Sequence, residues 1–162
     1  MLVSSKIVNG INGNFKIPGD KSISHRSIII SSISNGTTEI SNLLLSEDVI
    51  NTLNAFKAMG VKIEKNKEKV LIKGRGLNSL TKSKGNINLG NSGTSARLLT
   101  GLLSTQNFNS ILVGDDSLSN RPMERITKPL ELMGAKFKSN KNKLPLQIFW
   151  RKLKKINYEL EL

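Results

Sequence analysis

The stretch IPGDKSISHR concentrates cations and hydroxyl groups at the point where a helix should begin. Lys21, Ser22 and Arg26 follow one another closely, and the next residues are mostly apolar. The start of a helix exposes unpaired backbone N–H groups and carries the positive end of the helix dipole, so it repels cations and attracts anions. Ser22 and Arg26 are four residues apart and share one face of the expected helix. These residues predict a site for an anion such as a phosphate group.

A second stretch, LGNSGTSAR, repeats the same chemistry later in the chain. Gly93 and Arg97 occupy the equivalent helical face, and Asn91 lies near the expected N-cap. A glycine in the first helical turn leaves room for a ligand to reach the backbone. We expect a second anion-binding helix start here.

A third stretch, GDDSLSNRPMER, places another cation before a helix. Arg121 directly precedes Pro122, and proline is favoured in the first turn of a helix. We therefore expect Arg121 to stand at the start of a helix as well.

Each of these stretches alone also fits an ordinary surface. Lys21 and Arg26 can form a solvated face, the segment 91–94 can be a cap and a turn, and Arg121 can be a surface residue. His25 is expected to serve packing or hydrogen bonding. Three cationic helix starts in repeated units favour the functional interpretation over the ordinary one.

The elements that must position these residues follow from periodicity and capping signals. Ser46 should cap a helix that ends at Gly60, and Pro129 should kink a later one. We expect strands over 2–8, 13–17, 37–43 and 109–116, helices over 21–34, 46–60, 91–104 and 121–134, and hairpins of 61–65 with 69–74 and of 135–139 with 144–149.

The chain contains an internal repeat of these elements. Gly19, Asp20, Ser24 and Arg26 align at one constant spacing with the set Gly90, Asn91, Ser95 and Arg97. AMGVKIEKNKEKVLI likewise parallels LMGAKFKSNKNKLPLQI. Two copies of a helix–strand–helix–hairpin unit predict stacked units whose equivalent helix starts lie side by side.

Composition narrows the class of protein. The 162 residues include no cysteine and one histidine, which argues against disulfides and against thiolate or histidine metal sites. No signal peptide or membrane-spanning run is visible in the sequence, so we expect a cytoplasmic protein. The net charge of +13 raises nucleic acid as a partner. Scattered lysines and only 4% aromatic residues argue against that partner.

PGDKSISHR, LGNSGTSARLL and GDDSLSNRPMERITKPLELMGA closely resemble the N-terminal part of the 5-enolpyruvylshikimate-3-phosphate (EPSP) synthases, from about Ile7 to Tyr158. The resemblance implies an α/β (α+β) fold of repeated units, the inside-out α/β barrel of the enolpyruvyl transferases, which is incomplete here. Residues 1–17 would be opening strands of the second domain, 18–84 the first unit and 85–162 the second, before a missing third.

The resemblance also implies an activity. These enzymes transfer the carboxyvinyl group of phosphoenolpyruvate to the 5-hydroxyl of shikimate 3-phosphate and need no cofactor or metal. Lys21, the catalytic candidate, would contact both substrates. Ser22 and Arg26 would hold shikimate 3-phosphate. Four further residues would hold or flank phosphoenolpyruvate: Asn91, Gly93, Thr94 and Arg121.

Two alternatives accompany this interpretation. The related UDP-N-acetylglucosamine enolpyruvyl transferases usually have Lys-Asn where this chain has Lys21-Ser22, and often a loop cysteine that is absent here. A different class would be a non-catalytic basic module that binds anions or nucleic acid.

Trp150 and the ending YELEL depart from the family pattern, so we expect a truncated chain. Alone, this chain should be inactive and should self-associate, whereas the resemblance implies a monomeric enzyme.

Overall fold

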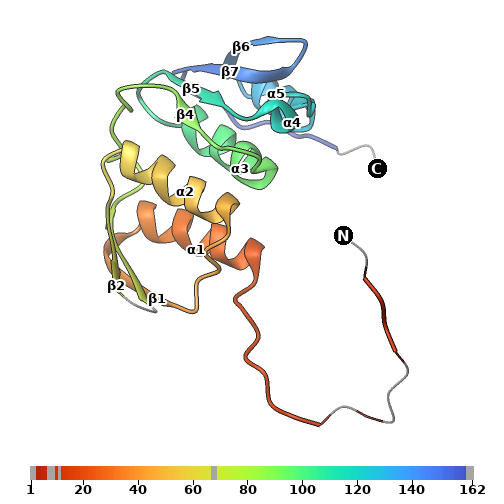
Figure 1. Ribbon diagram of the computed structural model, residues 1–162. Helices are drawn as coiled ribbons and strands as arrows, with labels where there is room; N and C mark the ends of the chain where they lie inside the picture. Colours follow the sequence, from red (N-terminus) through yellow and green to blue (C-terminus); the bar gives the residue numbers. More distant parts are fainter. Residues whose placement is uncertain (1–2, 7–9, 11, 67–68, 160–162) are drawn as a thin grey trace.

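Two sheets flank a layer of helices in the computed structural model, which describes residues 3–6, 10, 12–66 and 69–159 (Figure 1). The first half of the chain forms one sheet with its helices, and the second half forms the other. The elements of the first half are α1 (Lys21–Ile33), β1 (Asn35–Ser41), α2 (Glu47–Ala58), β2 (Lys62–Asn66) and β3 (Lys69–Arg75). Those of the second half are β4 (Ile87–Asn88), α3 (Gly93–Ser104), β5 (Ser110–Val113), α4 (Asp116–Ser119), α5 (Glu124–Leu132), β6 (Lys136–Asn140) and β7 (Lys143–Phe149).

The two sheets share a strand arrangement. The first has the order β1-β3-β2 and is antiparallel, while the second has the order β4-β5-β7-β6 with β4 parallel to β5. In each sheet the strand after the first helix pairs with the second strand of the hairpin: β1 with β3, and β5 with β7. The second half therefore repeats the topology of the first, with β4 and α4 added.

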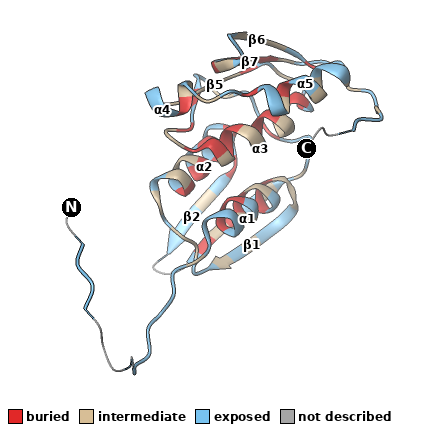
Figure 2. Ribbon diagram, turned by 90° about the vertical axis from the view of Figure 1, so that its right-hand side faces the viewer, coloured by how far each residue is buried: buried red, intermediate tan, exposed pale blue. Residues whose placement is uncertain are grey.

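The hydrophobic core lies between the sheets, where the helices contact one another. α1 packs against β3, α3 packs against β7, and α1 contacts both α2 and α3. The buried faces of these helices point toward the interior (Figure 2). Ile28, Phe56, Leu99 and Leu146 are fully buried, and each such side chain contributes about 1.5–3 kcal/mol by leaving water. This core fixes the positions of the helix starts.

The helix over 47–58 forms largely as its sequence indicates. Glu47 and Asp48 occupy its first turn, and Gly60, with φ +86°, follows its C-cap. Ser46 stands at the N-cap position, but its side chain makes no cap bond, and its buried Oγ has no partner among the described residues. The prediction that Ser46 occupies the N-cap position is therefore confirmed, and the prediction that its side chain caps the helix is wrong.

The expected strands before residue 18 are wrong where the structure describes them. Residues 3–6 and 12–20 form no strand, and the rest of the 2–8 prediction lies outside the described residues. This segment runs away from the sheets (Figure 1), and Phe15 is 84% exposed. A strand needs a hydrogen-bonded neighbour, which this segment does not reach.

The region around Pro122 also differs from the expectation. The strand ends at Val113, and Asp115 then caps the short α4 by accepting a hydrogen bond from the Leu118 amide at 2.7 Å. α5 begins only at Glu124, so Pro122 precedes the helix instead of starting it. Asp115 and Asp116, which the sequence placed at the end of the strand, therefore form the N-cap and the first residue of α4. Pro129 lies inside α5, and its kink stays a prediction.

Candidate functional site

The first turns of α1, α2 and α3 lie at the same end of the helical layer, on the right in Figure 1. α1 begins after Asp20, whose side chain accepts a hydrogen bond from the Ile23 amide at 2.7 Å. Lys21 is the first helical residue, and the first turn of α1 holds no acidic residue. The helix start therefore presents a cation beside its exposed N–H groups.

The Lys21 ammonium is held by the neighbouring helix. Its Nζ lies 3.0 Å from Oδ2 of Asp48, which stands in the first turn of α2, where the helix dipole favours a carboxylate. The Lys21 side chain is 51% exposed and that of Asp48 is 24% exposed. The ammonium is thus oriented by one partner and still open to a ligand.

Ser22 and Arg26 remain exposed on α1. Arg26 lines an open groove of about 520 Å³ between α1 and β1, together with Ile23, Ile30 and Glu39 among others. The structure therefore gives Arg26 an open approach along one side of the helix.

A second cluster gathers at the start of α3. A methyl group added at Gly93 would lie 2.9 Å from Nη1 of Arg121 and 3.1 Å from Nη1 of Arg97. Nη2 of Arg121 donates a short hydrogen bond to Oδ1 of Asn91 and lies 3.4 Å from Oγ of Ser117. Two guanidinium groups therefore converge on the first residue of α3.

This cluster corrects the expectation for Arg121 and refines that for Asn91. Arg121 does not stand at the start of its own helix; it follows α4 and reaches across to α3. The N-cap of α3 is Ser92, whose side chain accepts from the Ser95 amide, and Asn91 precedes it. Thr94 is half-buried in the first turn of α3.

A buried polar network joins the three helices one turn below these side chains. Nδ1 of His25 lies 2.8 Å from Oγ1 of Thr52, which lies 2.6 Å from Oγ of Ser95. Ser95 in turn lies 2.7 Å from the hydroxyl of Ser92. Burial lowers the pKa of His25, and Lys21 lowers it further, while Asp48 acts in the opposite direction. The imidazole is therefore neutral at pH 7.

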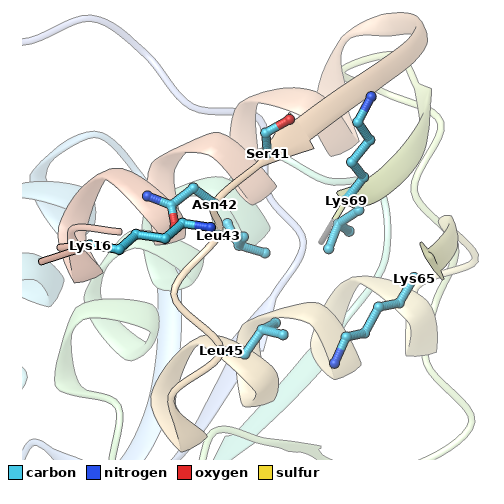
Figure 3. A pocket seen from close by; sticks show the side chains of 8 residues that line it. Lys16, Ser41, Asn42, Leu43, Leu45, Lys65 and Lys69 are labelled. Atoms are coloured by element: carbon cyan, nitrogen blue, oxygen red, sulfur yellow. The ribbon is translucent and has the colours of Figure 1, made fainter. Parts of the chain in front are cut away.

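A separate pocket of about 410 Å³ opens beside the N-terminal segment (Figure 3). Lys65 and Lys69 line one side, and Lys16 and Asn42 line another. These lysines are exposed, and Lys69 pairs with Glu39 at 2.6 Å. The convergent, partly buried guanidinium groups of Arg97 and Arg121 make a better anion site than these exposed lysines.

The described residues contain neither a helix suited to crossing a membrane nor a group of three acidic, histidine or cysteine side chains that could bind a metal.

Comparison with known proteins decides the family. The family model for EPSP synthase (3-phosphoshikimate 1-carboxyvinyltransferase) matches residues 6–162. The chain belongs to the EPSP synthase family. It is 56% identical over 153 residues to the 3-phosphoshikimate 1-carboxyvinyltransferase of Vesicomyosocius okutanii and 48% identical over 161 residues to that of Oceanobacillus iheyensis. These alignments cover 94% and 98% of this chain, but 35% and 38% of the relatives.

Solved structures agree with this family assignment. An EPSP synthase from Acinetobacter baumannii superimposes with a TM-score of 0.85 at 49% identity, covering 90% of this chain and 34% of that one. The expected family and fold class are confirmed. The chain spans about a third of the length of the relatives it matches.

Sequence reasoning missed the partners of the candidate residues. Asp48 is recognisable in the sequence only as a residue that favours a helix start, and nothing local links it to Lys21. Thr52 and Ser95 carry no signal of their contact with His25. The constant spacing between the two repeats was the one pattern that indicated neighbouring helix starts.

Proposed function

We propose that this chain carries the anion-binding helix starts of a 3-phosphoshikimate 1-carboxyvinyltransferase of the shikimate pathway. The observation that carries the proposal is the convergence of Arg97 and Arg121 on Gly93, joined through the helix contacts to the half-exposed ammonium of Lys21. Phosphoenolpyruvate and shikimate 3-phosphate are both phosphorylated, so each needs such cations. We infer the identity of these two substrates from the membership of the EPSP synthase family.

The family resemblance implies the roles of the residues, and their positions are compatible with these roles. Lys21, the first residue of the first of the three adjoining helices, would contact both substrates. Ser22 and Arg26, exposed on α1, would bind shikimate 3-phosphate. The cluster at the start of α3 would bind phosphoenolpyruvate through Gly93 and Arg121, flanked by Asn91 and Thr94.

The reaction forms a bond between the 5-hydroxyl oxygen of shikimate 3-phosphate and C2 of phosphoenolpyruvate. The hydroxyl loses its proton, and C3 gains one, which gives a tetrahedral intermediate. C3 then loses a proton as the C2–O bond to phosphate breaks. The cations proposed here orient both substrates and stabilise the departing phosphate, and a well-placed donor of this kind contributes about 2.7–4 kcal/mol.

The proposal includes a cytoplasmic reaction without cofactor or metal and a monomeric enzyme, as the family resemblance implies. We expect the isolated chain to bind ligand without turnover. Leu98, Leu132 and Trp150 are large apolar side chains between 42% and 52% exposed, so we also expect the isolated chain to self-associate.

The experiment is a turnover assay of the full-length transferase that carries this segment. Lys21→Ala should abolish phosphate release, because the ammonium that bridges the substrates is lost. Lys138→Ala removes the same charge from the exposed face of β6 and should leave the rate unchanged. Near-normal rates for Lys21→Ala would refute the role of Lys21.

A non-catalytic basic module is the second candidate, favoured by the net charge of +13. Binding to such a module depends mainly on counterion release and weakens steeply with salt. Specific binding of shikimate 3-phosphate that persists at high salt supports the transferase. Salt-sensitive binding that ignores the identity of the ligand supports the module.

A further inference from the structure

His25 is fully buried at the centre of the contact between α1, α2 and α3. Its Nδ1 lies 2.8 Å from Oγ1 of Thr52 and 3.3 Å from Oγ of Ser95. One side chain therefore contacts both neighbouring helices, α2 in its second turn and α3 in its first turn. It binds no ligand in the reaction proposed above, so its burial needs another explanation.

We assign the donors of this network from the one bond whose acceptor is fixed. With the Thr52 hydroxyl donating to the backbone oxygen of Asp48 at 3.2 Å, the same hydroxyl accepts from Nδ1–H of His25 and from the hydroxyl of Ser95. In this assignment the Ser92 hydroxyl donates to that of Ser95, and it also accepts from the Ser95 amide at 3.2 Å. We assign the neutral Nδ1–H tautomer on this basis. Nε2 then carries no proton, and it is buried without a partner among the described residues.

This network lies directly beneath the candidate site. Lys21 precedes His25 by four residues, and Asp48 precedes Thr52 by four, so the ion pair and the His25–Thr52 contact occupy successive turns of the same two helix faces. Asn91, which accepts from Arg121, likewise precedes Ser95 by four residues. A change in the spacing of His25, Thr52 and Ser95 would therefore also move Lys21, Asp48 and Asn91, one turn closer to the helix starts.

We propose that neutral His25 is a positioning residue that sets the spacing of the first turns of α1, α2 and α3, and so holds the Lys21–Asp48 pair opposite the Gly93–Arg121 cluster. This inference rests on the proposed function, because it concerns the same site. Its structural part, the spacing of the helices, can be measured without any ligand.

Protonation of His25 should disturb this arrangement. The charged groups that face the imidazole are Asp48 on α2 and Lys21 on α1, while α3 presents the Ser95 hydroxyl. A proton on Nε2 would create a buried donor without a partner and a cation beside Lys21. The helix starts should then separate, and anion binding should weaken as the pH falls.

The test compares His25→Asn, which can keep a hydrogen bond to Thr52 and does not titrate, with His25→Leu, which can do neither. The affinity for shikimate 3-phosphate is measured across the pH range on the full chain. We expect His25→Leu to lose about tenfold, the loss typical of an unpaired buried partner, and His25→Asn to stay close to the wild type at neutral pH. Toward acidic pH, the wild type should lose affinity relative to His25→Asn, a ratio in which the ligand's own ionisation cancels.

A second readout needs no ligand. The chain has no cysteine, so Ile23→Cys and Leu98→Cys, both at exposed positions of α1 and α3, allow two spin labels to report the distance between these helices. The distance distribution should broaden in His25→Leu and in the wild type at acidic pH, and stay narrow in His25→Asn. Because His25 is the single histidine, its NMR signals also report the tautomer directly.

The outcomes separate the two proposals. Unchanged affinity and unchanged distances in His25→Leu would overturn the positioning role. If the wild type binds no shikimate 3-phosphate while the distances change as described, the proposed substrate fails and the positioning of the helices stands. If His25→Leu does not fold, the comparison of the wild type with His25→Asn decides. The inference is overturned if the ratio of their affinities does not change with pH and NMR finds a protonated Nε2 at neutral pH.

Discussion

Lys21 and Asp48 are 27 residues apart in the chain, yet Nζ of the one lies 3.0 Å from Oδ2 of the other at the starts of adjacent helices. The contact explains how a cation is tolerated at the positive end of a helix dipole. The carboxylate on α2 offsets the repulsion that the dipole of α1 exerts on the ammonium. The pair also fixes the ammonium where a second anion can approach it.

Removing the carboxylate should strengthen simple anion binding. Asp48→Asn takes a negative charge away from the site, so we expect inorganic phosphate to bind severalfold more tightly. The unfolding free energy should change by less than about 1 kcal/mol, because the pair is partly exposed. Calorimetric titration with phosphate measures the first effect and urea unfolding the second.

Glu64→Gln provides the control for this prediction. It removes the same charge from an exposed pair with Lys62 on β2, at 2.9 Å, and should leave phosphate binding unchanged. Equal gains in both variants would mean that overall charge, and not the helix starts, governs the binding.

A methyl group at Gly93 should impair ligand binding without unfolding the chain. In Gly93→Ala the new Cβ would meet the guanidinium groups of Arg121 and Arg97 at 2.9 and 3.1 Å. These are the ends of flexible side chains and can move aside, so the melting temperature should change little. The displaced cations should weaken phosphoenolpyruvate binding by about tenfold or more, since one good charged hydrogen bond is worth about 1.5–3 kcal/mol.

Gly101→Ala in the same helix is the matched comparison. A Cβ at Gly101 would meet nothing within 4 Å, so alanine should stabilise the helix by about 0.5–1 kcal/mol and leave binding intact. The pair of variants separates helix propensity from the site. Equal affinities for phosphoenolpyruvate in the two variants would argue against the cluster at Gly93.

The guanidinium shape of Arg121 should matter as much as its charge. Arg121→Lys keeps the cation but loses the planar fork, in which Nη2 donates to Asn91 while Nη1 faces Gly93. We expect Arg121→Lys to weaken phosphoenolpyruvate binding and to change the unfolding free energy by less than it changes the binding free energy. Arg125→Lys, at an exposed position of α5, should have no effect on either measurement.

Stability should decrease as the pH falls below the ordinary pKa of histidine. Burial lowers the pKa of His25 from 6.5, so in the folded chain the imidazole takes up a proton only at lower pH than in the unfolded chain. Between those two pKa values the unfolded chain binds more protons, and acidification favours it. Well above 6.5 both states hold neutral histidine, and this effect vanishes.

Urea unfolding of the wild type and His25→Asn checks this sign. The difference in urea midpoint between the two proteins should be constant well above pH 6.5 and should shift against the wild type as the pH falls through that value. Carboxylate titrations are common to both proteins and cancel in the comparison. A constant difference across the whole range would show that His25 keeps its ordinary pKa.

Local signals in the sequence predicted most of the secondary structure. The acidic first turn and the terminal glycine of residues 46–60 determine α2 within two residues, because caps act through neighbouring backbone groups. The hairpins also formed at their expected positions, with Lys141 and Asn142 adopting positive φ angles in the turn between β6 and β7.

Signals that depend on distant parts of the chain failed. The segment 13–17 has a strand pattern but no neighbouring strand, and Pro122 favours a helix start that Asp115 displaces by capping α4 first. The candidate site residues are recognisable by their types and by the family resemblance, and their roles stay a prediction. Their partners, above all Asp48 and Thr52, come together through the packing of helices, which no local pattern specifies.

The most direct test of the central claim is an NMR titration of the chain with shikimate 3-phosphate at low and at high salt. The account predicts shifts concentrated at the backbone amides of the first turns of α1 and α3, such as Ser22, Ile23, Gly93 and Thr94, that persist at high salt. Shifts spread over the exposed lysines of the hairpins, and lost at high salt, would contradict the account.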